Sequence, residues 1–189
     1  MITEKDIIEY LKVNDTKALT VLRGHVNIVD KFGNVILDKD NLVVFKGREF
    51  ILNKLFSGIN NVPEENRVIM AYGVGDGGTG TETTGTNVSP SPFLPSYTDT
   101  KLMSQRGGLV KIEPAYITKK VDINNNEVYM HLVIKLDEIF TNNSVINEFG
   151  LFAVDEGTTN NPQLVTRITF GDIMYSAGDE LTLNYYLYA

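Results

Sequence analysis

Residues Val128-Tyr129-Met130-His131-Leu132-Val133-Ile134-Lys135-Leu136 carry the clearest periodicity in the chain. Apolar side chains recur at every second position, and more polar ones stand between them. Successive side chains of a β-strand point to opposite faces, so a period of two predicts a strand with one face in a core and one wetter face. Such a strand needs others to pair with.

Further apolar runs, each bounded by turn-forming residues, lie on both sides of this stretch. They cover residues 22–37, 67–74, 110–117, 118–122, 149–154, 164–170 and 181–188. The first run predicts a hairpin, because Gly33 and Asn34 tolerate the positive φ that a tight turn requires. Polar turns rather than helices separate the runs. The chain is therefore expected to be mainly β, an antiparallel β-sandwich or jelly-roll-like domain.

Two helices are expected beside the strands. Thr3, followed by Asp6 and by the apolar residues Ile7, Ile8 and Leu11, is typical of a short capped amphipathic helix. Apolar residues in the range 48–56 recur at roughly helical spacing, which predicts a second helix. We therefore expect an N-terminal helical arm, residues 1–17, and a single β-sandwich domain, residues 18–189. The arm would dock on another protomer or pack on its own sheet, and the sequence leaves both open.

Residues 75–96 interrupt the strand pattern. They are almost entirely Gly, Thr, Ser, Pro and Asn, with little apolar material to offset the entropy of ordering them. The segment therefore predicts a long Gly/Thr/Pro surface loop. Loops of this length inside a compact domain are usually functional or disordered.

Composition argues against several classes of function. The formal net charge of −7, with no cluster of Lys and Arg, argues against nucleic acid as a partner. The absence of cysteine removes disulfides, thiolate metal sites and cysteine nucleophiles. No apolar run reaches about 18 residues, and the N-terminus lacks the basic and apolar regions of an export signal, so we expect no membrane partner.

Short motifs with possible chemistry have simpler explanations. Residues 73–78 satisfy G-x-G-x-x-G after a strand, but the Thr- and Gly-rich continuation does not start the helix that nucleotide binding needs. Residues 122–127 begin like a calcium loop but lack its glycine and distal glutamate. His25 and His131 lie on polar strand faces, and no G-x-S-x-G occurs. We expect no enzyme, no cofactor and no dedicated metal site. An adventitious cation at Asp38, Asp40 and Asn41, or at Asp76 with Glu82, stays open.

Several motifs follow one another in a distinctive order. They are Tyr72-Gly73-Val74-Gly75-Asp76-Gly77-Gly78-Thr79, Pro90-Ser91-Pro92, Asp99-Thr100-Lys101-Leu102, Asn147-Glu148-Phe149-Gly150-Leu151-Phe152 and Leu164-Val165-Thr166-Arg167-Ile168-Thr169-Phe170. This order resembles tailed-bacteriophage virion proteins, particularly the N-terminal attachment domains of tail fibres. The resemblance covers roughly residues 67–188. No fibre shaft or receptor-binding tip follows the last strand, which favours an accessory subunit of the neck or collar, the baseplate or tail-fibre attachment, or the head surface.

The resemblance implies a structural subunit of the virion, made in the host cytoplasm, whose partners are other virion subunits and copies of itself. The residues expected at its interfaces are Ile7, Ile8, Leu11, Gly75, Asp76, Gly77, Gly78, Tyr186 and Tyr188. Glycines 73, 75, 77 and 78 would let the backbone turn sharply and approach a neighbour. We also expect Glu148 to pair with Arg167 on an adjacent strand.

A carbohydrate-binding, lectin-like sandwich is the alternative. Such domains often use exposed Tyr and Asn side chains in loops to bind sugars. The absence of Trp counts against this alternative. Residues 184–189 place tyrosine on both faces of the last strand, which suits an interface, and an aromatic-capped core strand would explain the same residues.

Overall fold

The computed structural model describes residues 23–58, 64–84, 87–123, 127–136, 144–176 and 179–188. The elements in chain order are β1 (Arg23–Asp30), β2 (Val35–Val43), α2 (Phe45–Leu55), β3 (Arg67–Gly75), β4 (Thr79–Thr84), β5 (Asn87–Pro92), β6 (Gln105–Lys111), the 3-10 turn η1 (Pro114–Tyr116), β7 (Ile117–Asp122), β8 (Glu127–Lys135), β9 (Ser144–Asp155), β10 (Gln163–Tyr175) and β11 (Leu181–Tyr188). The prediction of a mainly β protein is confirmed. The helix predicted at residues 48–56 is present as α2, whereas the one predicted near the N-terminus lies outside the described residues.

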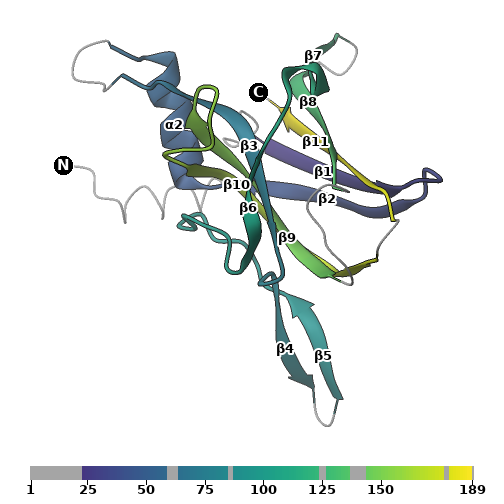
Figure 1. The fold of residues 1–189 in the computed structure, drawn as a ribbon. Coiled ribbons are helices and arrows are strands. Elements are labelled where there is room, and N and C mark those ends of the chain that lie inside the picture. The colour runs from purple at the N-terminus through teal and green to yellow at the C-terminus, as the bar shows by residue number, and fades with distance from the viewer. Residues whose placement is uncertain are drawn as a thin grey trace.

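Within the described ranges, nine strands form one antiparallel sheet in the order β6-β3-β9-β10-β2-β1-β11-β8-β7. The sheet curls, as Figure 1 shows, and it is weakest in the middle. There β10 pairs with β2 through only two residue pairs, Thr166 with Val43 and Arg167 with Leu42. The sheet therefore has two halves, β6-β3-β9-β10 and β2-β1-β11-β8-β7. No described helix is long and apolar enough to cross a membrane.

The main core fills the inside of the curl. Both halves contribute fully buried side chains, including Val26, Ile28, Leu183 and Tyr185 from one half and Phe149, Leu151, Ile168 and Phe170 from the other. Burial of this apolar surface supplies the main stabilisation of the fold, at about 25 cal/mol per Å². The alternation in β8 has the expected effect, because Leu132 and Ile134 point into this core.

The outer face of the β3-β9-β10 half is also covered. Residues 93–104 cross this face, where Leu102 is buried with Phe152 and Leu164. Helix α2 packs against the other side of this half, where Phe50 is buried with Val165 and a Cβ on Gly47 would overlap the Val165 backbone. Strand β9 is consequently buried on both sides along most of its length, which accounts for its nearly continuous apolar sequence.

The prediction of a loop at residues 75–96 is wrong for the central part of this segment. Strands β4 and β5 pair there along their whole length, from Thr79 opposite Pro92 to Thr84 opposite Asn87. Figure 1 shows this hairpin standing away from the curled sheet. Threonine is β-branched and favours extended backbone, so a Thr-rich ribbon forms strands without an apolar face of its own.

Candidate functional site

The most elaborate polar arrangement in the described structure lies where the β4–β5 hairpin leaves the sheet. The chain goes out through residues 75–79 and returns through residues 93–104, across the outer face of β9 and β10. Six side chains hold both crossings, and we call them the hairpin anchor: Thr79, Asp99, Asn147, Glu148, Arg167 and Asp172.

The centre of the anchor is the ion pair of Glu148 and Arg167. Oε2 of Glu148 accepts hydrogen bonds from Nη2 and Nε of Arg167, at 2.8 and 3.1 Å. The backbone N–H groups of Met103 and Ser104 donate to the same carboxylate, at 3.0 and 2.7 Å. Glu148 is completely buried and Arg167 nearly so. Taking charges out of water is costly unless they are paired and fully hydrogen bonded. Arg167 supplies two of the four donors to this carboxylate, and the two backbone donors fix the returning segment in place.

Arg167 also reaches a second carboxylate. Its Nη1 lies 2.7 Å from Oδ2 of Asp99, on the returning segment. The same oxygen accepts the N–H of Ser96 at 2.9 Å, and the N–H of Asp99 donates back to the carbonyl of Ser96 at 3.0 Å. This tight turn orients Asp99 toward the guanidinium. One arginine therefore ties together β9, β10 and the segment that follows the hairpin.

Asn147 holds the outgoing chain. In the β9–β10 ladder, Thr169 faces Glu148 and Ile173 faces Ile146, so β10 bulges opposite Asn147. The Asn147 side chain is therefore free to turn outward. Its Oδ1 accepts the N–H of Gly78 at 2.6 Å, and its Nδ2 donates to Thr79 Oγ1 and to Asp172 Oδ1, both at 2.9 Å. The amide is thus satisfied as donor and acceptor at the first residues of the hairpin.

The glycines expected at an interface lie close to their own chain. A Cβ on Gly78 would overlap the carbonyl of Asn147, and one on Gly75 would overlap Glu148 and the carbonyl of Ser104. A Cβ on Gly77 would come within 2.6 Å of the N atom of Ser104. Close approach, rather than an unusual φ, is what requires glycine here. The neighbours that the backbone approaches are Ser104 and Asn147.

Asp76 attaches the outgoing crossing to β6 and to the returning segment. Its carboxylate pairs with Arg106 of β6, and its N–H donates to the carbonyl of Ser104 at 3.1 Å. A hydrogen bond from the Ser104 side chain, and then the Arg106 guanidinium, hold the pKa of Asp76 below its ordinary value. The carboxylate is therefore ionised and bound within the chain.

Tyr186 and Tyr188 lie elsewhere, on the face of β11 opposite the core. The ring of Tyr186 is parallel to that of His131, with centroids 4.6 Å apart. Tyr129 packs against both tyrosines, and the Arg23 guanidinium lies 4.2 Å over the ring of Tyr188. Burial is the main cause that raises the pKa of each tyrosine. The structure thus gathers these predicted residues into an aromatic row, far along the sheet order from the anchor.

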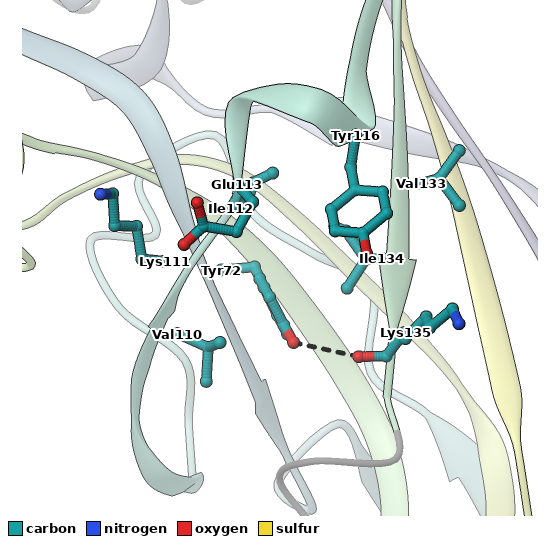
Figure 2. Close-up of a pocket in the computed structure, with 9 residues that line it drawn as sticks. All are labelled: Tyr72, Val110, Lys111, Ile112, Glu113, Tyr116, Val133, Ile134 and Lys135. Atoms are coloured by element: carbon teal, nitrogen blue, oxygen red, sulfur yellow. Dashed lines mark hydrogen bonds between the residues drawn. The ribbon is translucent and has the colours of Figure 1, made fainter.

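A small hollow lies between the two halves of the sheet. Figure 2 shows Tyr72 of β3 pointing across it, and the Tyr72 hydroxyl donates to the carbonyl of Lys135 at 3.2 Å. Residues of β6, η1 and β8 complete the wall, and the volume is about 180 Å³. Pockets for typical small ligands are larger, about 300–1,000 Å³. The hollow therefore does not compete with the anchor as a candidate site.

Ile7, Ile8 and Leu11 lie outside the described residues. Sequence reasoning missed Thr79, Asp99, Asn147 and Asp172 in the anchor, although the bulge-forming Gly171 beside Asp172 was a usable signal. In the described ranges no group of three or more His, Asp or Glu side chains is arranged to hold a metal ion. Comparison with protein-family models, curated proteins and solved structures gives no match for this chain.

Proposed function

We propose that this chain is a structural subunit of a tailed-phage virion, which works through contacts with other virion subunits and with its own copies, without catalysis. Its place is the neck or collar, the baseplate or tail-fibre attachment, or the head surface. The observation that carries the proposal is a hairpin that stands off the body of the protein and is held by a buried polar network (Figure 1).

The energetics of the anchor support a docking role for the hairpin. An isolated two-stranded hairpin is at best marginally stable in water. A buried charge network contributes little net stability compared with apolar packing, and its gain is a defined geometry. The chain places such a network under β4 and β5, where Gly78 and Thr79 lead into the hairpin. The arrangement therefore serves to hold the hairpin in one position.

The two edges of the hairpin differ. Pro90 and Pro92 lie in β5 opposite Thr81 and Thr79. Proline has no N–H, so both prolines occupy positions whose backbone groups point away from β4. The outer edge of β5 therefore lacks two donors and cannot pair fully with another strand. The N–H and C=O of Thr81 then point outward from β4. A neighbouring strand would add to the β4 edge, in the manner of β-augmentation.

The motifs that carry the virion resemblance converge on this place. Residues 75–79 form the outgoing crossing, Asp99 and Leu102 lie on the returning segment, and Asn147 and Glu148 hold both. Leu102 is buried against Phe152, from the same motif as Asn147 and Glu148, and against Leu164 of the last motif. In this chain, the motifs of the resemblance therefore lie together at the anchor.

We also propose that the curled sheet is a β-sandwich whose layers are its two halves. The short β10–β2 junction and the single core between the halves support this assignment. The lectin-like alternative is less well supported. Sugar rings stack on open aromatic faces, whereas the face of Tyr186 is covered by His131.

A matched pair of proline variants tests the proposal. Thr81→Pro removes an outward N–H from the β4 edge, and Val88→Pro removes one from the β5 edge that already carries two prolines. Each protein is offered to particles that lack the native chain, and incorporation is measured by mass spectrometry. We expect Thr81→Pro to reduce incorporation at least tenfold, the loss expected from about 1.4 kcal/mol, and Val88→Pro to match the native chain.

Light scattering of the purified native protein and a glycan screen complete the test. Several copies per particle together with self-association support the structural role. A monomer that never enters particles contradicts it, and glycan binding by that monomer would establish the alternative.

A further inference from the structure

An apolar groove of about 290 Å³ lies at one end of the curled sheet, apart from the anchor. Its walls come from α2 and β3 on one side and from β7, β8 and β11 on the other. The main lining residues are Ile51, Ile69, Val128, Met130, Leu187 and Tyr188, and Lys119 is the charged residue among the lining.

The groove is a continuation of the core. Val128 and Met130 alternate in β8 with the same parity as Leu132 and Ile134, which are buried. Their side chains therefore point to the inner face of the sheet. In the described structure the opposite half leaves a gap over these strand ends, and Val128 remains 40% exposed. An inner face left open to water is unfavourable, in proportion to its apolar area.

The chain enters the sheet beside this groove. Arg23, the first described residue, is opposite Tyr188, and Gly24 is opposite Leu187. Both partners line the groove. The Arg23 side chain pairs with Glu127 and lies over the Tyr188 ring, which fixes the entry point. The residues that precede Arg23 therefore start from the rim of the groove.

Those residues contain the apolar stripe of Ile7, Ile8 and Leu11. Leu11 precedes Arg23 by twelve residues, a stretch that extends to at most about 40 Å. The connection is thus long enough for the stripe to fold back onto the groove. Residues 3–14 carry three acidic side chains and two lysines, so the net charge of the segment is opposite in sign to that of Lys119.

We propose that the groove is the docking site of residues 3–14 of the same chain, whose Ile7, Ile8 and Leu11 complete the core at this end. A segment tethered at the rim has a high effective concentration there and loses little entropy on docking. The inference goes beyond the proposed function, because it assigns the N-terminal arm to its own subunit and leaves the hairpin as the assembly contact.

Cross-linking is a clean test, because the chain has no native cysteine. Leu11→Cys is combined with Val128→Cys in the groove, and the pair is joined with a short bifunctional maleimide in dilute solution. The control pair is Leu11→Cys with Phe32→Cys, since Phe32 is exposed at the far end of β1. Equivalent pairs with Ile7→Cys and Ile8→Cys allow for the unknown register. We expect at least one pair with Val128 to cross-link within the chain, in roughly fivefold or higher yield than its Phe32 control.

A third substitution separates docking from mere proximity. Ile8→Asp, added to the Leu11→Cys/Val128→Cys pair, places a charge on the apolar stripe outside the described fold. The cross-link yield should fall to the control level. An unchanged yield, or no cross-link at any of the three positions, overturns the proposal. Cross-linked dimers also overturn it, because they assign the groove to the arm of a second copy. None of these results depends on incorporation into particles.

Discussion

Nη2 of Arg167 lies 2.8 Å from Oε2 of Glu148, although the two residues are not opposite each other in the sheet. In the β9–β10 ladder Glu148 faces Thr169 and Arg167 faces Gly150. The contact is therefore a diagonal one, which a long side chain spans between adjacent antiparallel strands.

Glu148→Ala is expected to destabilise the protein by about 3–5 kcal/mol, because it leaves Arg167 buried beside a single remaining carboxylate, Asp99. Urea unfolding measures the change. Glu49→Ala is the control, since it removes a salt bridge to Lys46 that is exposed on α2, and such pairs contribute about 0–1 kcal/mol. A loss below 1 kcal/mol for Glu148→Ala would contradict a structural role for the buried pair.

Gly78→Ala is expected to lower the free energy of unfolding by about 1–3 kcal/mol, because the added methyl group overlaps the carbonyl of Asn147 and forces the outgoing crossing off β9. Hydrogen exchange in β4 and β5 should accelerate in the same variant. Gly108→Ala is the matched control, since nothing lies within 4 Å of its Cβ position. Equal exchange rates in the two variants would show that the hairpin does not depend on the anchor.

Acid should weaken the fold partly through Glu65. A hydrogen bond from the Arg67 side chain is the main cause that lowers the pKa of Glu65 below its ordinary value of 4.5, and the pair is 2.6 Å apart. A lowered folded-state pKa gives stability that is complete above pH 4.5 and is lost as the pH falls through the folded value. Below pH 4.5, the free energy of unfolding of Glu65→Gln should therefore fall less steeply with decreasing pH than that of the native protein. Parallel acid profiles for the variant and native chain would exclude this contribution.

Much of the fold was predictable from local patterns. Alternation identified β8, and Gly33 with Asn34 identified the β1–β2 turn, where Gly33 has φ of 83°. The expected pairing of Glu148 with Arg167 is confirmed. Two opposite charges that are buried on adjacent strands are less costly when they pair with each other.

The hairpin was not predictable in the same way. Thr79 and the strand it begins have no apolar alternation, and their position depends on Asn147, which is remote in sequence. Asp99 is likewise recognisable as a partner of Arg167 only once the returning segment is placed over β10. Long-range polar contacts of this kind leave no local period, so they escape sequence reasoning.

Tyr185 offers a test of how the sheet tolerates polar groups in its core. Its hydroxyl accepts a hydrogen bond from Nδ2 of Asn41 at 3.0 Å, and Oδ1 of Asn41 has no hydrogen-bond partner among the described residues. Tyr185→Phe leaves the buried amide of Asn41 without this acceptor, which should cost about 1–3 kcal/mol in urea unfolding.

The double variant Asn41→Leu/Tyr185→Phe removes both partners and should recover most of that loss, since two apolar groups need no hydrogen bond. Tyr186→Phe, on the outer face of the same strand, is the control and should change stability by less than about 0.5 kcal/mol. If the double variant is no more stable than Tyr185→Phe alone, the cost arises from other contacts of the Tyr185 hydroxyl, such as that with Thr166, and the Asn41 amide is not the cause.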